Sequence, residues 1–196
     1  TGRAVRILSI HKSKGLEFPV TIVADCAKNF NESDLKEPVL IHQELGFGSK
    51  CRDVQRGVQY DTVERVAVAV RQRREMISEE LRVLYVAMTR AKEKLVMVHT
   101  QANAKSRVAD LLALSDCPVL PEAVDSGKCM GDWIMLPLLQ RSEAGALRAF
   151  AGQNSEGRFF AEETPWTVCV HDGLQFASPV QQSDAAAEER APQREE

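Results

Sequence analysis

The stretch from Thr62 to Lys92 limits the possible folds most, because a long helical pattern there leads directly into a strand. Its apolar residues recur at steps of three and four, which places them on one face of an α-helix. They are Val63, Val66, Val70, Met76, Ile77, Leu81, Leu84, Tyr85 and Met88. The polar segment RQRRE at 71–75 leaves open one helix or two, with Asp61 as the N-cap of the first and Ser78 near the start of the second.

Short runs rich in β-branched residues flank this helix and predict strands. VRILSI (5–10) and VTIVAD (20–25) precede it, and KLVMVHT (94–100) follows it. The runs are too uniformly apolar for a sheet with one solvated face, so we expect an α/β fold with helices on both faces of a mostly parallel sheet. A polar loop with a half turn of helix joins the first two runs, and VLIHQELGFG (39–48) predicts a small hairpin.

After residue 101 the pattern changes to short helical segments separated by proline and glycine. SRVADLLALS (106–115) and CMGDWIMLPLL (129–139) are the two helical candidates. Residues 179–196 are rich in Gln, Ala, Glu and Pro and contain no aromatic residue, which predicts a disordered tail.

The composition argues against several classes of protein. The 196 residues are 44% hydrophobic and 27% charged, as in ordinary globular chains, and the net charge of −3 excludes polyanion binding through bulk charge. The five cysteines are scattered without a CxxC pair, so we expect free thiols in a reducing cytoplasm. No apolar run approaches the roughly 20 residues of a membrane span. The chain opens at Thr1 and leads directly into a predicted strand, as expected for an internal part of a larger protein.

The sequence does not contain a complete catalytic set. A phosphate-binding loop has the form GxxxxGK[ST], and the nearest match, GQNSEGRF (152–159), lacks both the lysine and the hydroxyl. The four histidines show no metal-binding spacing, and we see no nucleophilic or nuclease arrangement. We therefore predict no metal site, and no ATP hydrolysis by this chain alone.

The loop after the first predicted strand is the first candidate site. It carries His11, Lys12, Lys14, Gly15 and Glu17. Loops at strand ends of α/β sheets often hold ligands. The cations can meet a phosphate backbone, the glycine permits close approach, and the carboxylate can accept hydrogen bonds from sugar hydroxyls. A solvated loop without a ligand remains the alternative.

Arg90 is the second candidate, because it follows an apolar run at the expected end of the long helix. Two further cations, Lys92 and Lys94, come directly after it. The guanidinium group is a rigid, always charged fork that suits phosphate. The alternatives are a helix-end charge that reaches solvent or a salt bridge to a nearby glutamate.

Together the two segments resemble motifs V and VI of the superfamily 1 DNA helicases of the UvrD, Rep and RecB type. HKSKGLEFP resembles motif V and LRVLYVAMTRAKEKL resembles motif VI, in the family's order, over roughly residues 5–100. About 60 residues separate the two motifs, including FNESD and LIHQELGFG, and GDWIMLPLL follows them. This layout is similar to that of the AddA helicase–nuclease subunits of bacterial AddAB complexes.

The resemblance implies a role for each matching residue. Arg90 would be catalytic, reaching the ATP γ-phosphate across the cleft between two RecA-like domains. Gly15 and Glu17 would lie beside the ribose. His11, Lys12 and Lys14 would contact DNA. ATP and Mg²⁺ would be bound mainly by residues outside this chain, because the family's other nucleotide motifs are absent from it.

The resemblance also implies a domain division and a function. Residues 1–100 would be the C-terminal part of a second RecA-like motor domain, of the P-loop NTPase type, and 101–178 a helical or irregular extension towards a nuclease domain, followed by the tail at 179–196. The expected function is that of an ATP-dependent 3′–5′ DNA helicase/nuclease subunit in double-strand break repair and recombination. Its expected partners are single-stranded and duplex DNA and an AddB-like protein, with no membrane. The alternatives are a UvrD-like helicase without a nuclease and a non-catalytic domain that docks a partner.

Overall fold

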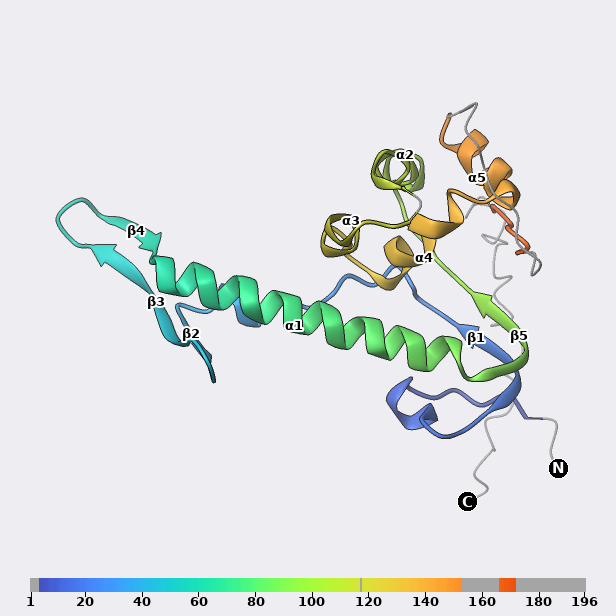
Figure 1. The fold of residues 1–196 in the computed structure, drawn as a ribbon, viewed down its shortest axis with the longest axis horizontal. Coiled ribbons are helices and arrows are strands. Elements are labelled where there is room, and N and C mark those ends of the chain that lie inside the picture. The colour runs from blue at the N-terminus through green and yellow to red at the C-terminus, as the bar shows by residue number, and fades with distance from the viewer. Residues whose placement is uncertain (1–3, 117, 153–165, 172–196) are drawn as a thin grey trace, which may run out of the picture.

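The computed structural model describes residues 4–116, 118–152 and 166–171. Helix α1 crosses the molecule, with a small sheet at one end and the remaining strands and helices at the other (Figure 1). The elements are β1 (Phe18–Val23), β2 (Val39–His42), β3 (Gly46–Asp53), β4 (Val58–Asp61), α1 (Val63–Met88), β5 (Ala91–Met97), α2 (Ala104–Leu114), α3 (Pro121–Asp125), α4 (Met130–Leu138) and α5 (Gly145–Phe150), with 3₁₀ turns at His11–Ser13, Asp34–Lys36 and Ser142–Ala144. The tail predicted at 179–196 and most of the glycine-spaced segment 152–159 lie outside the described residues.

The long helical pattern forms one continuous helix of 26 residues. Its N-cap is Thr62, whose hydroxyl accepts a hydrogen bond from the Arg65 amide at 3.3 Å. The predicted cap at Asp61 is therefore wrong, and this carboxylate instead pairs with the Arg65 side chain at 2.9 Å. The helix also ends at Met88 rather than at Lys92.

Ion pairs accompany the polar segment 71–75 within the helix. Arg71 pairs with Glu75 one turn further on at 2.9 Å, and Arg73 pairs with Glu32 at 3.0 Å. An ion pair at i,i+4, such as Arg71–Glu75, stabilises a helix by about 0.2–0.5 kcal/mol. A second helix starting near Ser78 is therefore wrong.

Strands β1 and β5 form a two-stranded parallel sheet. Each begins two to three residues before its predicted range, although the strand type and order were predicted correctly. The predicted strand at 5–10 is wrong. Val5 and Ile7 are each 94% exposed, and no other described strand pairs with this segment. Helices on both faces are not seen either, because Val20 and Ile22 of β1 are 51% and 64% exposed.

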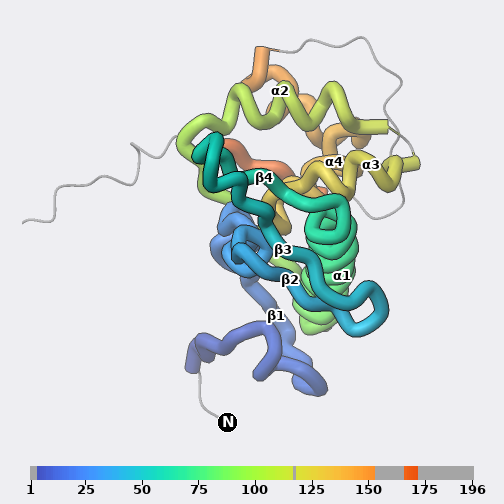
Figure 2. Tube along the Cα trace, turned by 90° about the vertical axis from the view of Figure 1, so that its left-hand side faces the viewer, coloured from blue at the N-terminus to red at the C-terminus, as the bar shows by residue number. Residues whose placement is uncertain are grey.

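The predicted hairpin is confirmed and belongs to a three-stranded antiparallel sheet in the order β2-β3-β4. This sheet lies at the N-terminal end of α1 in Figure 1, and Figure 2 shows it beside the helix. Gly48 of β3 permits the close approach, because a Cβ atom there would be 2.3 Å from the Arg65 amide nitrogen. Both the strand and the helix backbone would have to separate to fit any other residue.

The predicted helices at 106–115 and 129–139 are confirmed as α2 and α4. With α3 they pack on the second half of α1 around one apolar cluster. Its buried members are Ile77, Leu84, Val108, Leu111, Ala123, Trp133, Met135, Leu136 and Leu139. Residues on both sides of position 100 therefore contribute to one core.

Four cysteines lie in the described part of the chain, and all four are free. Cys26 and Cys129 are buried, and Cys51 and Cys169 are exposed. Across the described residues, no helix has the length and apolar character needed to cross a bilayer.

Candidate functional site

The parallel pairing of β1 and β5 brings the two candidate segments together. Phe18 aligns with Ala91, and the Phe18 amide donates to the Arg90 carbonyl oxygen at 2.9 Å. The loop that ends at Glu17 therefore lies beside the end of α1, as Figure 1 shows for the blue loop and the green end of the helix. Both segments lie at the same edge of this sheet, where the two strands begin.

Arg90 is half-buried and is held in place by three hydrogen bonds. Its Nε donates to the Val86 carbonyl at 2.8 Å, and its Nη2 donates to the Thr89 hydroxyl at 2.9 Å. Its Nη1 donates to the Leu16 carbonyl at 3.0 Å. A guanidinium group has five N–H donors, so two remain beyond these three bonds. The helix C-terminus, with its partial negative charge, also favours a cation here.

Thr89 positions this guanidinium group. The single proton of its hydroxyl is shared between the carbonyl oxygens of Tyr85 and Val86, at 2.9 and 3.1 Å, and the hydroxyl oxygen accepts from Arg90 Nη2. Arg90 therefore contacts carbonyl and hydroxyl oxygens, and among the residues that the structure describes it forms no salt bridge to a glutamate. No role for Thr89 was predicted from the sequence. The available signal was a hydroxyl residue directly before an arginine at a helix end.

Glu17 pairs with Lys92 rather than with Arg90. The carboxylate Oε2 lies 2.9 Å from Lys92 Nζ, and both side chains are exposed. The hydrogen bond and charge of Lys92, with a smaller contribution from the charge of Arg90, lower the pKa of Glu17. Glu17 is therefore ionised at neutral pH. In the sequence Lys92 stood out only as part of a basic cluster, and its pairing with Glu17 was not predicted.

The loop before Glu17 has a defined backbone shape. Ser13 is buried and its hydroxyl donates to the Ile10 carbonyl at 2.6 Å, which closes the 3₁₀ turn. Gly15 has φ = +82°, a conformation that residues with a Cβ atom adopt at a cost. Its position leaves open space where a Cβ would lie, so backbone conformation rather than crowding requires the glycine.

His11, Lys12 and Lys14 lie on this turn and its end. All three side chains are exposed. No ion pair is recorded for them among the described residues. The structure thus places Gly15, Glu17 and Arg90 at one edge, with the three basic residues on the adjoining turn.

At this edge of the sheet, the charged guanidinium group of Arg90 can donate hydrogen bonds to an anion. Arg90 supplies two further N–H groups, and Glu17 supplies a carboxylate that can accept hydrogen bonds. Within the described ranges no three His, Cys, Asp or Glu residues are grouped so as to hold a metal ion. The residues fit one side of a phosphate site and do not enclose a phosphate.

Comparison with known proteins gives two results. The family model described as the UvrD-like helicase C-terminal domain matches residues 1–102. Two AddA proteins, the ATP-dependent helicase/nuclease subunits of Bacillus thuringiensis and Bacillus cereus, are each 40% identical over 179 residues, and that of Bacillus mycoides is 37% identical over 178 residues. These alignments cover 89% of this chain and 14% of each relative, so the chain spans about a seventh of their length.

Proposed function

The chain belongs to the UvrD-like helicase C-terminal domain family and is homologous to AddA, an ATP-dependent helicase/nuclease subunit, and we propose that it supplies Arg90 to an ATP site completed by other residues. The observation that carries the proposal is the placement of Arg90 and the Gly15–Glu17 loop at one edge of the β1–β5 sheet. In this proposal residues 1–100 are the C-terminal part of a second RecA-like motor domain. Residues 101–178 extend towards a nuclease domain.

The proposed chemistry assigns one task to each group. Bound ATP supplies the phosphoryl group that is transferred to water. The two remaining N–H groups of Arg90 face the γ-phosphate and stabilise the charge that develops during transfer. The Glu17 carboxylate accepts hydrogen bonds from the ribose, and Gly15 lets the loop backbone approach it. We assign no Mg²⁺ ligand to this chain and place the metal with the residues that hold the triphosphate.

The Arg90–Leu16 hydrogen bond supports a link between ATP and DNA. A shift of the guanidinium towards phosphate changes its bond to the Leu16 carbonyl, in the loop that follows His11, Lys12 and Lys14. In our proposal these three residues contact single-stranded DNA. The Arg90–Leu16 hydrogen bond therefore couples ATP hydrolysis to a change in the affinity for DNA.

At the level of the whole protein, we propose an AddA-type helicase/nuclease. It would unwind DNA with 3′–5′ polarity in double-strand break repair, together with an AddB-like partner protein. The names of the relatives favour this over a helicase without a nuclease. The hydrogen bonds that hold the Arg90 side chain favour a catalytic site over a non-catalytic domain that docks a partner.

The test is DNA-stimulated ATP hydrolysis by the complete protein that contains this segment. Arg90→Ala should lower turnover about 10³-fold or more, as loss of such an arginine does in other NTPases. Arg82→Ala is the matched control, since Arg82 is exposed and, within the described part of the chain, pairs only with Glu79 one turn before it. Turnover near the wild-type level in Arg90→Ala would exclude the proposed role.

A further inference from the structure

A polar pocket of about 510 Å³ lies at the opposite end of β1 from Glu17 and Arg90. Three separate parts of the chain form it: the loop after β1, the middle of α1, and the turn between α3 and α4. The lining residues are Asn29, Phe30, Asn31, Glu32, Ser33, Lys36, Arg73, Ser126 and Lys128. None of these residues belongs to the site described above.

The charge of this lining favours an anion. Lys36, Arg73 and Lys128 are cationic, and Glu32 is the one acidic lining residue. Arg73 is fixed in place, because its Nε donates to Glu32 at 3.0 Å and its Nη1 donates to the Asp125 carbonyl at 2.8 Å. Lys36 and Lys128 are exposed, and no side-chain partner is recorded for either among the described residues. Two ammonium groups are therefore available to a ligand.

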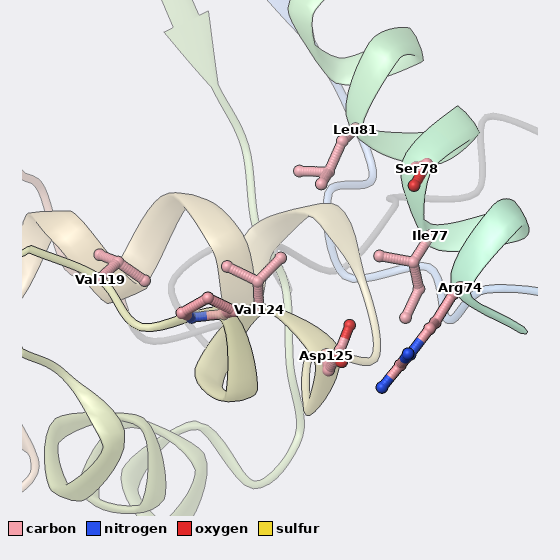
Figure 3. A pocket seen from close by; sticks show the side chains of 8 residues that line it. Arg74, Ile77, Ser78, Leu81, Val119, Val124 and Asp125 are labelled. Carbon is pink, nitrogen blue, oxygen red and sulfur yellow. The ribbon is translucent and has the colours of Figure 1, made fainter. Parts of the chain in front are cut away.

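The Asp125 carboxylate lines a neighbouring pocket and not the polar one. This second pocket, of about 440 Å³, lies between α1 and α3 and is mostly apolar (Figure 3). Its lining residues are Arg74, Ile77, Ser78, Leu81, Val119, Pro121, Val124 and Asp125. The Asp125 side chain thus lines the apolar pocket, while its carbonyl holds Arg73 for the polar one.

The backbone of the polar pocket is fixed before any ligand binds. The Phe30 amide donates to the Lys128 carbonyl at 2.9 Å, and Asn29 forms an isolated antiparallel bridge with Cys129. The loop after β1 is therefore tied to the turn before α4. The Phe30 ring packs against Trp133 with centroids 4.5 Å apart, which fixes an aromatic side chain in the lining.

We propose that this pocket binds a phosphate group of single-stranded nucleic acid, with Lys36 and Lys128 as direct contacts, Arg73 as a guanidinium held in place by Glu32 and the Asp125 carbonyl, and Phe30 as the surface for a base. Cations that follow the backbone beside an aromatic residue are the usual means of binding single strands. The inference rests on the proposed function and adds a second DNA contact to it. The six residues of β1, which span roughly 20 Å, and residues 24–28 separate Glu17 from Asn29, the first pocket residue in the chain.

The test is the salt dependence of the affinity for a fluorescent single-stranded oligonucleotide, measured without ATP on the complete protein. Each phosphate contact on a single strand contributes about 0.7 to the slope of log K against log salt concentration. Because the two lysines contact the same phosphate group, the double variant Lys36→Gln/Lys128→Gln should bind more weakly, with a slope smaller by about 0.7. Both side chains are exposed, so the substitutions should leave the fold intact.

Arg52→Gln/Arg56→Gln is the matched control, because it removes two exposed charges from the β3–β4 end of the molecule. Its slope should equal that of the wild type. An unchanged slope in the pocket variant, or an equal loss in the control, would overturn the inference. The measurement needs no ATP hydrolysis, so it tests the pocket independently of Arg90. The DNA contact in the pocket can be disproved while Arg90 is shown to be essential for ATP hydrolysis, and the reverse is equally possible.

A second measurement distinguishes binding of a DNA backbone phosphate from binding of free phosphate. Inorganic phosphate and ATP are titrated against the bound oligonucleotide at constant ionic strength. Weak competition, equal in wild-type protein and pocket variant, supports a DNA backbone contact. Strong competition by inorganic phosphate that the pocket variant loses would assign the pocket to free phosphate and overturn the DNA contact.

Discussion

Nη1 of Arg90 donates a hydrogen bond to the carbonyl oxygen of Leu16 at 3.0 Å, although 74 positions separate the two residues. The bond joins the end of α1 to the loop that carries Gly15 and Glu17. Parallel pairing of β1 with β5 makes it possible, because both strands begin at this edge. In our proposal a change at the ATP phosphate reaches the DNA-facing loop through this contact.

Replacing Gly15 should strain this loop without crowding it. With φ = +82°, Gly15→Ala should lower the free energy of unfolding by about 1–2 kcal/mol. Asparagine tolerates the left-handed region better, so Gly15→Asn should lose less. Urea unfolding of the three proteins gives the comparison, and equal stability of the alanine variant and the wild type would contradict the backbone argument.

Lys92 should control the ionisation of Glu17. Lys92→Ala should raise the pKa of Glu17 towards its ordinary value of 4.5, with the charge of Arg90 keeping part of the shift. Lys94→Ala is the matched control and should leave this pKa unchanged. A pH titration followed by NMR at the Glu17 carboxyl carbon measures the effect.

The direction of the Glu17 pKa shift determines how the stabilisation by the Glu17–Lys92 pair depends on pH. Because the folded-state pKa of Glu17 lies below its unfolded value, the pair stabilises the fold above the unfolded pKa. That contribution is lost as the pH falls through the folded-state pKa. Acid should therefore weaken the Glu17–Lys92 contact.

The buried ion pair between Arg107 of α2 and Asp132 of α4 should be a large contributor to stability. Asp132 is 1% exposed, and it accepts from Arg107 Nε at 3.0 Å and from the Lys128 amide at 2.7 Å. Burial alone would raise the pKa of Asp132, but these hydrogen bonds outweigh it and lower the pKa. Asp132→Ala leaves the largely buried Arg107, 15% exposed, without this carboxylate and should cost about 3–5 kcal/mol.

The exposed pair Glu79–Arg82 serves as the control for this prediction. Glu79→Ala should change the free energy of unfolding by less than about 0.5 kcal/mol. Denaturant unfolding measures both variants. Similar small losses in the two would show that the buried pair contributes no more than a surface pair.

Thr89 should act through the position of Arg90. Thr89→Val removes the oxygen that accepts from Arg90 Nη2, and kcat of DNA-stimulated ATP hydrolysis should fall by about tenfold or more, because small misplacements of catalytic groups are costly. KM for ATP should change little, and Thr89→Ser should restore most of kcat. Equal kcat in the valine and serine variants would exclude a positioning role for the hydroxyl.

Much of the candidate site, at the edge where β1 and β5 begin, could be predicted from the sequence. The long helix, its order between two strands, and the candidate residues Gly15, Glu17 and Arg90 follow from periodicity and from the two motifs. The structure places these residues at one edge. The assignment of ATP and DNA roles to them stays a prediction.

Other features depend on contacts that periodicity does not encode. The run 5–10 has the composition of a strand, but a strand needs a partner, and the described residues offer none. The pairing of Glu17 with Lys92 depends on how the loop meets β5. The polar pocket joins Lys36, Arg73 and Lys128, which are far apart in sequence and meet where the loop after β1, α1 and the turn before α4 pack together.

The most direct test of the central claim compares two nucleotide states in the complete protein. Binding of ADP with aluminium fluoride, which mimics the transferring phosphoryl group, is measured against binding of ADP alone. We predict that Arg90→Ala weakens the analogue by about 10³-fold or more and ADP by much less, since the fork acts on charge present only during transfer. Equal affinity of wild-type protein and Arg90→Ala for the analogue would contradict the placement of Arg90 at the γ-phosphate.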